Sequence, residues 1–493
     1  MITSSIPLFH TSQIRDCERI AINDLGLSET ELMATAGKAA YNALGQLFPS
    51  SKNLLVYCGS GNNAGDGYVL AQLAHEAGYL VTIKQYKLPD DLPPAAKAAA
   101  LAALDAGINC QSLEDDIGSD VDLIIDSLLG TGLSGPVNEL MSAAIHQINN
   151  SQLPVFSIDI PSGLNADTGC VMGACVQATA TITFIACKLG LMTMDGPDHC
   201  GKIVSHDLGL TDFVTTISPA ANLLGTEFSA NLLPKRLKNS HKKDFGHVLI
   251  VGGGMGMPGS VLLAANAAMR VGAGLVSIAT RPEYANAALA HLPEAMIYGI
   301  KRASQLQSLL EKATVCVLGP GLGTDYWAKK LFQLILASKK PIIIDASALR
   351  ILAHAPQQCD NWVITPHPGE AADLLACSVD DIQADRYQSV VSLQTKYGGQ
   401  VVLKGAGSLV RTAEPATYLC NAGNPGMATA GMGDVLSGVI AGLAAQGLSL
   451  ADATKLAVSV HARAADRAVE KEGERGLIAS DLMPWLRFLV NDI

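Results

Sequence analysis

The sequence lacks the paired cysteines, the density of charge and the long apolar runs that mark several classes of protein. Its 11 cysteines form no CxxC pair and no His/Cys cluster at zinc spacing, so we expect reduced, mostly buried thiols in a cytoplasmic protein. Only 16% of the residues are charged and the net charge is −11 at pH 7. A broad nucleic-acid or anionic-membrane surface needs a basic patch, so we expect small-molecule partners, with no nucleic acid and no membrane.

The 493 residues, 49% of them hydrophobic, exceed what a single hydrophobic core usually holds, which indicates more than one domain. Short β-branched runs such as 54–58 (LLVYC) and 123–129 (LIIDSLL) alternate with Ala/Leu-rich stretches of helical length. That alternation is typical of parallel strands buried on both faces. The pattern lapses around 210–240 and restarts at 247–254 (HVLIVGGG). We expect two doubly wound α/β domains, 1–225 and 226–493, and the apolar composition favours a homo-oligomer.

A glycine-rich loop follows the first predicted strand. The segment 59–65 (GSGNNAG) lies between a strand and a helix, where a helix N-terminus can bind an anion. Its spacing is one residue longer than GxGxxG, and the next strand ends in 84–86 (KQY) without the acid that holds the ribose in NAD-binding Rossmann units. A hydride-transferring fold is therefore disfavoured. Asn62, Asn63 and Asp66 are too polar for a mere turn and indicate a ligand site.

Two further strand ends carry polar residues. Asp126 ends one strand and precedes a glycine loop at 130–136, and Asp159 and Ser162 end the next strand. Ligands of open parallel sheets bind outside the carboxyl ends of the strands. We therefore expect these loops to form one crevice.

The stretch 423–438 (GNPGMATAGMGDVLSG) has a single charged side chain, Asp434. Small residues at the start of a helix allow backbone N–H groups to approach a phosphate, with Asp434 beside it as a base. The alternative is a tight turn that leads into a buried helix.

The N-terminal motifs GNNAGDG, DSLLGTGLSG and DIPSGLNADTG resemble those of NAD(P)H-hydrate epimerases. This resemblance implies a Rossmann-like three-layer sandwich in which Asp159 performs acid–base chemistry. It also implies a potassium ion bound by Asn63, Asp126 and Ser162. The residues that it assigns to the dinucleotide substrate are Asn62, Asn63, Ala64, Gly65, Asp66, Gly130, Thr131, Gly132, Leu133, Ser134, Gly135, Pro136 and Asp159.

The C-terminal motifs HVLIVGGGMGMPGS, GPGLG, IIIDASALRIL, ITPHPGEAADLL, VVLKGAG and GMGD occur in the order seen in ADP- or ATP-dependent NAD(P)H-hydrate dehydratases, which they resemble. The resemblance implies a ribokinase-like domain in which Asp434 takes the proton of the hydroxyl that is phosphorylated. The residues that it assigns to the hydrate are Gly321, His367, Pro368, Gly369, Glu370, Ala371, Ala372, Asp373 and Asp434. Those that it assigns to the nucleotide are Lys404, Gly405, Ala406, Gly407, Ser408, Asn424, Pro425, Gly426, Met427, Ala428, Thr429, Ala430, Gly431, Met432 and Gly433.

Two details of the second half stay open. Ser347 stands where these dehydratases often have Asp, which puts catalytic work at that position in doubt. Glu370 is either an acid that complements the helix dipole or a residue linked to Mg²⁺.

Together the resemblances imply a bifunctional enzyme that repairs hydrated NADH and NADPH (NADHX and NADPHX). One half would interconvert the R and S hydrates, and the other would dehydrate the S form and convert ADP to AMP and phosphate. A ribokinase-like small-molecule kinase and a binding or sensing module are the alternatives. The sequence leaves open ADP against ATP and NADHX against NADPHX.

Overall fold

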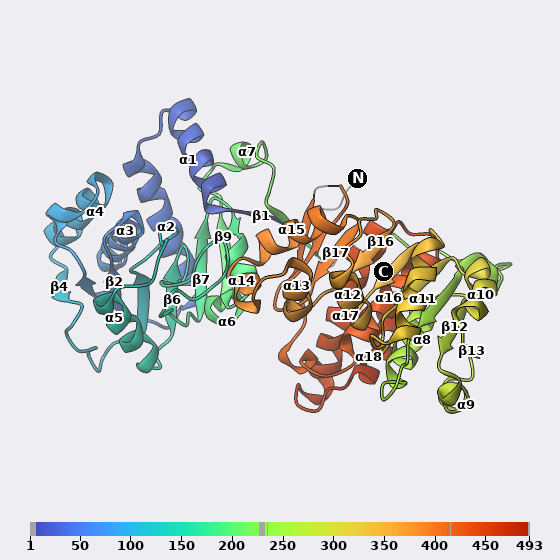
Figure 1. Ribbon diagram of the computed structural model, residues 1–493. Coiled ribbons are helices and arrows are strands. Elements are labelled where there is room, and N and C mark those ends of the chain that lie inside the picture. The colour runs from blue at the N-terminus through green and yellow to red at the C-terminus, as the bar shows by residue number, and fades with distance from the viewer. Residues whose placement is uncertain (1–5, 226–231, 234, 415, 492–493) are drawn as a thin grey trace. The chain divides into compact units, whose positions relative to one another are not determined.

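The computed structural model describes residues 6–225, 232–233, 235–414 and 416–491. The chain forms two compact units, Pro7–Ala221 and one built mainly of Asn222–Ile493, which run from blue to green and from green to red in Figure 1. The predicted boundary between residues 225 and 226 borders the segment 226–231, which lies outside the described residues. No helix in the described ranges is long and apolar enough to cross a membrane.

The first unit is built on a seven-stranded sheet of order β4-β3-β2-β5-β6-β7-β9, in which every neighbouring pair is parallel. Its strands are β2 (Asn53–Cys58), β3 (Leu80–Gln85), β4 (Asn109–Ser112), β5 (Leu123–Ser127), β6 (Val155–Ile158), β7 (Ala180–Phe184) and β9 (Lys202–His206). Strand β1 (Ile6–Phe9) pairs in parallel with β8 (Cys187–Lys188). The helices are α1 (Thr11–Leu25), α2 (Glu29–Leu47), α3 (Asn62–Glu76), α4 (Pro94–Asp105), α5 (Glu139–Asn150), α6 (Gly196–Cys200) and α7 (Thr211–Val214).

Helices cover both faces of this sheet, which explains why its strands are almost continuously apolar. Alternate residues of β2 belong to different cores: Val56 packs with residues of α2, α3 and α4, and Leu55 packs with residues of α5. A strand buried on both faces has no solvent side and needs no polar alternation. The unit is therefore a three-layer α/β/α sandwich.

The second unit contains a sheet of order β13-β12-β11-β14-β15-β16-β17-β18-β19-β10. It is parallel from β13 to β17, and the pairs β17–β18 and β18–β19 are antiparallel. The strands are β10 (Ala221–Leu223), β11 (His247–Val251), β12 (Leu275–Thr280), β13 (Met296–Gly299), β14 (Val315–Leu318), β15 (Ile342–Ile344), β16 (Trp362–Ile364), β17 (Gln400–Leu403), β18 (Ser408–Arg411) and β19 (Thr417–Cys420).

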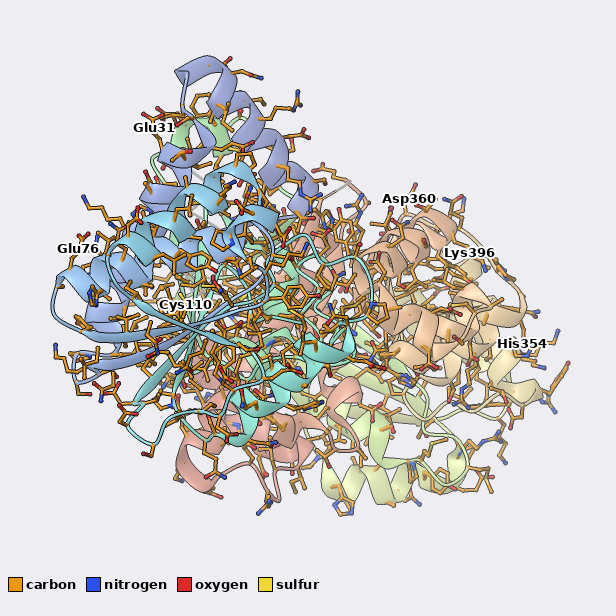
Figure 2. All side chains as sticks on the ribbon, turned by 90° about the vertical axis from the view of Figure 1, so that its left-hand side faces the viewer. Glu31, Glu76, Cys110, His354, Asp360 and Lys396 are labelled. Atoms are coloured by element: carbon orange, nitrogen blue, oxygen red, sulfur yellow. The ribbon has the colours of Figure 1, made fainter. Side chains whose placement is uncertain are left out.

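The helices of this unit are α8 (Gly259–Arg270), α9 (Pro282–His291), α10 (Gln307–Lys312), α11 (Tyr326–Ala337), α12 (Ser347–His354), α13 (Pro368–Leu375), α14 (Val379–Ala384), α15 (Arg386–Tyr397), α16 (Met432–Ala445), α17 (Leu450–Glu472) and α18 (Leu482–Leu489). Helices α8 and α16 pack very closely. A Cβ atom at Gly438 would lie 2.1 Å from the carbonyl oxygen of Ala264, so the small residues of α16 are required by this packing. Charged residues such as Glu31, Glu76 and Asp360 are exposed (Figure 2).

The predicted α/β class with parallel sheets is confirmed in both units. In each, the polar loops follow the carboxyl ends of parallel strands, which is where the candidate sites lie.

Candidate active sites

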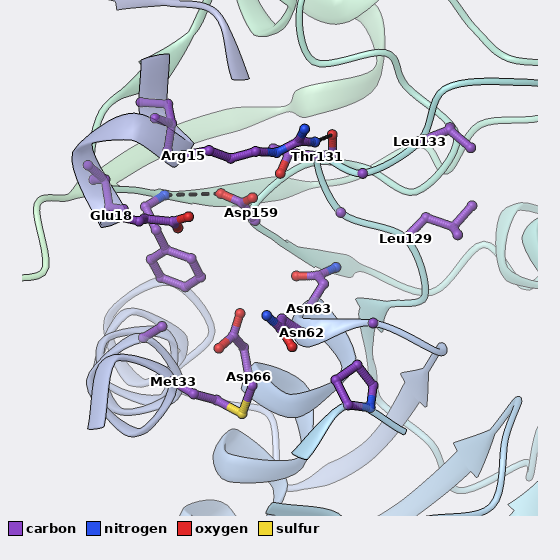
Figure 3. A pocket seen from close by; sticks show the side chains of 18 of the residues that line it. Arg15, Glu18, Met33, Asn62, Asn63, Asp66, Leu129, Thr131, Leu133 and Asp159 are labelled. Atoms are coloured by element: carbon purple, nitrogen blue, oxygen red, sulfur yellow. Dashed lines mark hydrogen bonds between the residues drawn. The ribbon is translucent and has the colours of Figure 1, made fainter. Parts of the chain in front are cut away.

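The first unit contains a cavity of about 800 Å³ at the carboxyl ends of its strands (Figure 3). Most of the residues assigned to the dinucleotide line it. They are Asn62, Asn63, Asp66, Gly130, Thr131, Gly132, Leu133, Ser134, Gly135, Pro136 and Asp159. Ala64 and Gly65 are instead buried in α3, and a Cβ atom at position 65 would lie 2.3 Å from Met33 Sδ. The structure therefore gives these two small residues a packing role.

Asp159 has a backbone conformation that non-glycine residues rarely adopt, with φ at 66°. Such strain persists only where the surrounding structure holds the residue, and it is common at functional sites. The Asp159 carboxylate forms an ion pair with the ammonium group of Lys188 and accepts a hydrogen bond from the Phe184 amide at 3.2 Å. These contacts fix the carboxylate at the cavity wall.

Lys188 is not among the predicted site residues, although it lines the cavity. It is 1% exposed, and besides Asp159 it donates hydrogen bonds to Thr183 Oγ1 and to the Phe184 carbonyl oxygen, each at 2.9 Å. Three acceptors satisfy the three N–H bonds of an ammonium group, so Lys188 is held as a fixed positive charge. A single lysine within the otherwise uncharged run 180–191 was the available signal in the sequence.

Two further acids face the cavity, Glu18 on α1 and Asp66 on α3 (Figure 3). Burial, followed by the negative charge of Asp159, raises the pKa of both carboxyl groups, that of Asp66 by a large amount. The cavity thus combines one carboxylate paired with a lysine and two carboxyl groups whose pKa values are raised. Glu18 lies outside every sequence motif, so sequence patterns gave no indication of its role.

The three residues assigned to potassium lie close to one another next to the end of β5. Asp126 is fully buried and accepts hydrogen bonds from Ser157 Oγ at 2.8 Å and from the Ser162 amide and hydroxyl at 2.9 and 2.5 Å. Asn63 neighbours this group, because its carbonyl oxygen accepts a hydrogen bond from Ser127, the residue after Asp126. Asn63 lines the cavity, whereas Asp126 and Ser162 are not among its lining residues.

The side chain of Asn63 supplies the test of whether a cation fits. Its Oδ1 and Nδ2 atoms are buried and have no hydrogen-bond partner among the described residues. A buried polar group without a partner is costly unless a ligand satisfies it, and hard oxygen donors suit alkali cations. The donor set therefore fits a potassium ion. The described residues contain no group of three or more His, Cys, Asp or Glu that could hold a metal.

In the second unit Asp434 lies in the first turn of α16, as predicted. The helix begins at Met432 after Gly431, whose φ of 91° places it in the left-handed region. Burial, followed by the negative charge of Asp345, raises the pKa of Asp434 to about 6, although a hydrogen bond from Ser260 and the charge of Lys404 oppose the shift. A carboxylate with a pKa near neutrality is suited to accept a proton as a general base.

Lys404 lies beneath this turn. Its Nζ atom is 3.1 Å from Asp345 Oδ1 and 3.7 Å from Glu370 Oε2, and a Cβ atom at Gly433 would lie 3.2 Å from it. The negative charges of Asp345 and Glu370 outweigh burial and raise the pKa of Lys404. The unit thus places a protonated ammonium group next to backbone N–H groups at a helix N-terminus, an arrangement that binds anions. Asp345 was not predicted; Ser347, the doubted position, is the first residue of α12.

His367 acts as the cap of α13. Its Nδ1 accepts hydrogen bonds from the amides of Gly369 at 3.0 Å and Glu370 at 3.3 Å, and Glu370 Oε2 accepts one from the His367 amide at 2.9 Å. Ala371 and Ala372 are buried in the helix, and Asp373 is exposed. The PHPGE motif therefore fixes the Glu370 carboxylate toward Lys404.

The two glycine loops of this unit lie against each other. The Gly254 amide donates to the Gly321 carbonyl oxygen at 2.6 Å, and Gly321 has φ of 58° with Met257 O only 2.5 Å from where its Cβ would be. Glycine is required at 321 because the backbones meet there.

The segments assigned to the nucleotide are anchored by hydrogen bonds from buried or partly buried polar side chains. Arg386, 1% exposed, donates to the carbonyl oxygens of Leu403 and Lys404 at 3.3 Å, and a Cβ atom at Gly405 would lie 2.6 Å from its Nη1. Asn424 donates to Asp466 Oδ1 at 2.9 Å and accepts from the Gly426 amide at 3.1 Å. These hydrogen bonds hold both loops in place.

The fold and these sites define a class: a two-unit α/β enzyme in which a Rossmann-like unit is joined to a ribokinase-like unit whose helix N-terminus is suited to an anion. Comparison with known proteins makes this specific. Residues 248–486 match the family model described as NAD(P)H-hydrate dehydratase, and residues 29–190 match the model described as YjeF-related protein N-terminus.

Curated relatives match along nearly their whole length. A bifunctional NAD(P)H-hydrate repair enzyme of Coxiella burnetii is 46% identical over 98% of this chain and 99% of its own, and that of Escherichia coli is 42% identical over 99% and 95%. The chain belongs to the family of bifunctional NAD(P)H-hydrate repair enzymes. The family predicted from the motifs, and its enzyme class, are thereby confirmed.

Solved structures match the second unit. An ADP/ATP-dependent NAD(P)H-hydrate dehydratase from Bacillus subtilis, co-crystallized with ATP/Mg²⁺, is 26% identical with a TM-score of 0.50 and covers 55% of this chain and 98% of its own. A ribokinase-like superfamily protein from Enterococcus faecalis is 27% identical with a TM-score of 0.52 over 56% and 97%. The ribokinase-like fold of the second unit is thus confirmed.

Proposed function

We propose that this chain repairs NADHX and NADPHX with two separate centres, an epimerase in 1–225 and an ADP- or ATP-dependent dehydratase in 226–493. The observation that carries the proposal is that each unit holds its own fixed acid–base carboxylate, Asp159 in the first and Asp434 in the second. Two unlike centres on one chain match two unlike steps on one damaged molecule.

The epimerase step requires proton transfer at a hemiaminal. The hydrate carries a hydroxyl on C6 next to the ring nitrogen, whose lone pair can expel the hydroxyl as water once an acid protonates it. Water then adds to the other face and loses a proton to a base. Asp159, paired with Lys188, is the base of this step, and the 800 Å³ cavity is within the size range of ligand pockets.

Potassium would be held by Asn63, Asp126 and Ser162. When bound it supplies a fixed positive charge that offsets the buried Asp126. The chain's own contribution is to connect that charge to the cavity wall: Ser162 Oγ accepts a hydrogen bond from the Leu129 amide at 2.8 Å, at the start of the 130–136 loop that lines the cavity.

In the dehydratase, Asp434 takes the proton of the C6 hydroxyl while that oxygen attacks the terminal phosphorus of the nucleotide. Backbone N–H groups of residues 430–433 and the Lys404 ammonium bind the transferring phosphoryl group. The phosphorylated oxygen then leaves as phosphate and a proton is lost from C5, which restores the dihydronicotinamide. With ADP the products are NAD(P)H, AMP and phosphate.

A dedicated Mg²⁺ cage does not fit the residues of the second unit. The oxygens of Asp345 and Glu370 already face Lys404, which leaves no vacant carboxylate pair beside Asp434 among the described residues of this unit. We assign no step to a metal held by the protein.

The test follows the absorbance of the dihydronicotinamide. The purified chain, supplied with S hydrate and ADP or ATP, should regenerate NADH and release one phosphate per NADH. R hydrate alone should be converted to the R/S mixture without nucleotide. A small-molecule kinase would consume nucleotide without restoring absorbance, and a binding module would do neither; each result would refute the proposal.

A further inference from the structure

The carboxylate of Asp345 occupies the centre of the second site and has no role in the reaction described so far. It follows β15 and is 1% exposed. It accepts hydrogen bonds from Thr365 Oγ1 and Ser437 Oγ, each at 2.8 Å, and from Lys404 Nζ at 3.1 Å. Thr365 and Lys404 directly follow β16 and β17, and Ser437 is in α16, so one side chain connects two strand ends and a helix next to the first turn of α16.

The backbone at this point is also unusual. Ala346, the next residue, has φ of 48°, which costs a non-glycine residue free energy and is retained where function demands it. A Cβ atom at Gly319, directly after β14, would lie 1.8 Å from the Asp345 carbonyl oxygen. Only glycine therefore fits at position 319 while the Asp345 backbone lies this close. Ordinary burial of an apolar residue would require neither feature.

We propose that Asp345 is a positioning residue of the dehydratase: it fixes the Lys404 ammonium beneath the first turn of α16 and places a permanent negative charge beside Asp434. This inference rests on the proposed dehydratase function. The two effects are distinct, since one acts through hydrogen bonds on phosphate binding and the other through charge on the base.

The hydrogen-bond effect follows from the geometry of Lys404. A lysine side chain is flexible, and its four-carbon stem loses conformational freedom when the ammonium is fixed. Asp345 Oδ1 holds Nζ 3.1 Å away, and Asp345 Oδ2 is 3.6 Å from where a Cβ atom of Gly433 would be. The ammonium is thus preorganised where the phosphoryl group must arrive, which lowers the entropic cost of binding.

The charge effect concerns the groups that face Asp434 from every neighbouring element. Asp345 and Glu370 raise the pKa of Asp434, whereas Lys404 and the hydroxyl of Ser260 on α8 lower it. His461 of α17 is close to Lys404, and burial lowers its pKa to about 4, so it is neutral at physiological pH. After burial, Asp345 makes the largest contribution to the raised pKa of Asp434.

The test uses the full chain and the variant Asp345→Asn, which keeps the side-chain shape and removes the charge. Rates of S-hydrate dehydration are measured against pH with saturating nucleotide. The rate of the parental enzyme should rise as Asp434 ionises, with a midpoint near 6. In the variant the midpoint should fall by about half to one pH unit, because removal of a nearby like charge favours ionisation. An unmoved midpoint in a folded variant would overturn the charge effect.

The second variant, Ser437→Ala, removes one hydrogen bond to Asp345 and leaves its charge. We expect the KM for nucleotide to rise several-fold with the pH midpoint unchanged. An unchanged KM would overturn the hydrogen-bond effect, and this variant tests the proposal even where Asp345→Asn does not fold.

Two controls separate this inference from the proposed function and from general destabilisation. Asp325→Asn removes a different carboxylate, which caps α11 and pairs with Arg281, and it should leave both the KM and the midpoint unchanged. R/S interconversion reports that the first unit is folded, and the unfolding midpoint of the second unit reports that the substituted unit is folded. If the parental chain itself does not dehydrate the hydrate, the proposed function fails; if it does and neither variant behaves as stated, only the inference on Asp345 fails.

Discussion

We expect the substitution Asp434→Asn to slow dehydration strongly without preventing nucleotide binding. Asparagine keeps the size of the side chain and its ability to accept the hydrogen bond from Ser260, but it cannot take up the proton of the C6 hydroxyl. Loss of a positioned general base costs roughly 10²- to 10⁴-fold in rate, which corresponds to about 3 to 5 kcal/mol. Nucleotide should still bind, because the backbone N–H groups of the first turn and Lys404 are unchanged.

The raised pKa of Asp434 also predicts that the Asp434→Asn variant is more stable than the parental chain at neutral pH, although its rate is lower. The pKa of Asp434 in the folded chain is about 6, above the ordinary aspartate value of 3.8 that applies to the unfolded chain. The folded state therefore binds the proton more tightly than the unfolded state. The stability that this proton adds is present below pH 3.8 and is lost as the pH rises through 6. At pH 7 the ionised carboxylate therefore destabilises the second unit, by about 1 to 2 kcal/mol after allowance for its partial exposure.

Both signatures can be measured on the same preparation. Single-turnover dehydration of S hydrate should be slower by the stated factor, and the rate should no longer rise between pH 5 and pH 7 as it does in the parental chain, whose base has a pKa of about 6. The unfolding midpoint of the second unit should rise at pH 7, and the difference should shrink toward pH 4. A variant that dehydrates at close to the parental rate would show that the GMGD stretch is only a turn.

The other predictions test the remaining assignments. Asp126→Ala should abolish the potassium dependence of R/S interconversion and slow it by at least roughly tenfold, while dehydration of pure S hydrate persists; equal loss of both activities would contradict two separate sites. Lys188→Met should lower kcat for interconversion by about 10²-fold because Asp159 loses its partner, and Lys188→Arg should recover part of it; a change in substrate KM alone would contradict this role. Gly405→Glu should raise the nucleotide KM of the dehydratase or prevent saturation, since its side chain meets Arg386 and adds negative charge beside the loop; unchanged nucleotide dependence would remove the loop from the site.

The sequence predicts the fold and the loops of the sites well, because both depend on patterns of neighbouring residues. Alternation of apolar runs with helical stretches indicates parallel strands, and glycines between a strand and a helix indicate anion sites. The 130–136 loop and Asp159 do line the cavity of the first unit. Motif boundaries are less informative within a helix: Ala64 and Gly65 belong to the GNNAGDG motif, yet helical geometry turns them into the core.

The residues that sequence patterns do not indicate are the partners of the predicted carboxylates. Lys188 pairs with Asp159 from a different strand end, and Asp345 reaches Lys404 and Ser437 across 59 and 92 residues of sequence. Such pairs depend on which strands are neighbours in the sheet, and no local periodicity carries that information. Asp345 is two residues from Ser347, the position where the resembling dehydratases often have Asp, so the motif alone does not indicate which of the two positions carries a functional acid.

In both units a carboxylate at one strand end is paired with a lysine from another, but the two pairs are used differently. In the first unit the paired acid is the proposed base: Asp159 faces the cavity, and its partner Lys188 is 1% exposed. In the second unit the paired acid, Asp345, is buried and the lysine faces the arriving phosphate. This difference follows from the chemistry, because a hemiaminal presents a hydroxyl that needs proton transfer, whereas a nucleotide presents negative charge that needs a fixed cation. The same two residue types therefore serve different purposes. Where the fold exposes the carboxylate, the pair is suited to proton transfer; where it exposes the lysine, the pair is suited to binding negative charge.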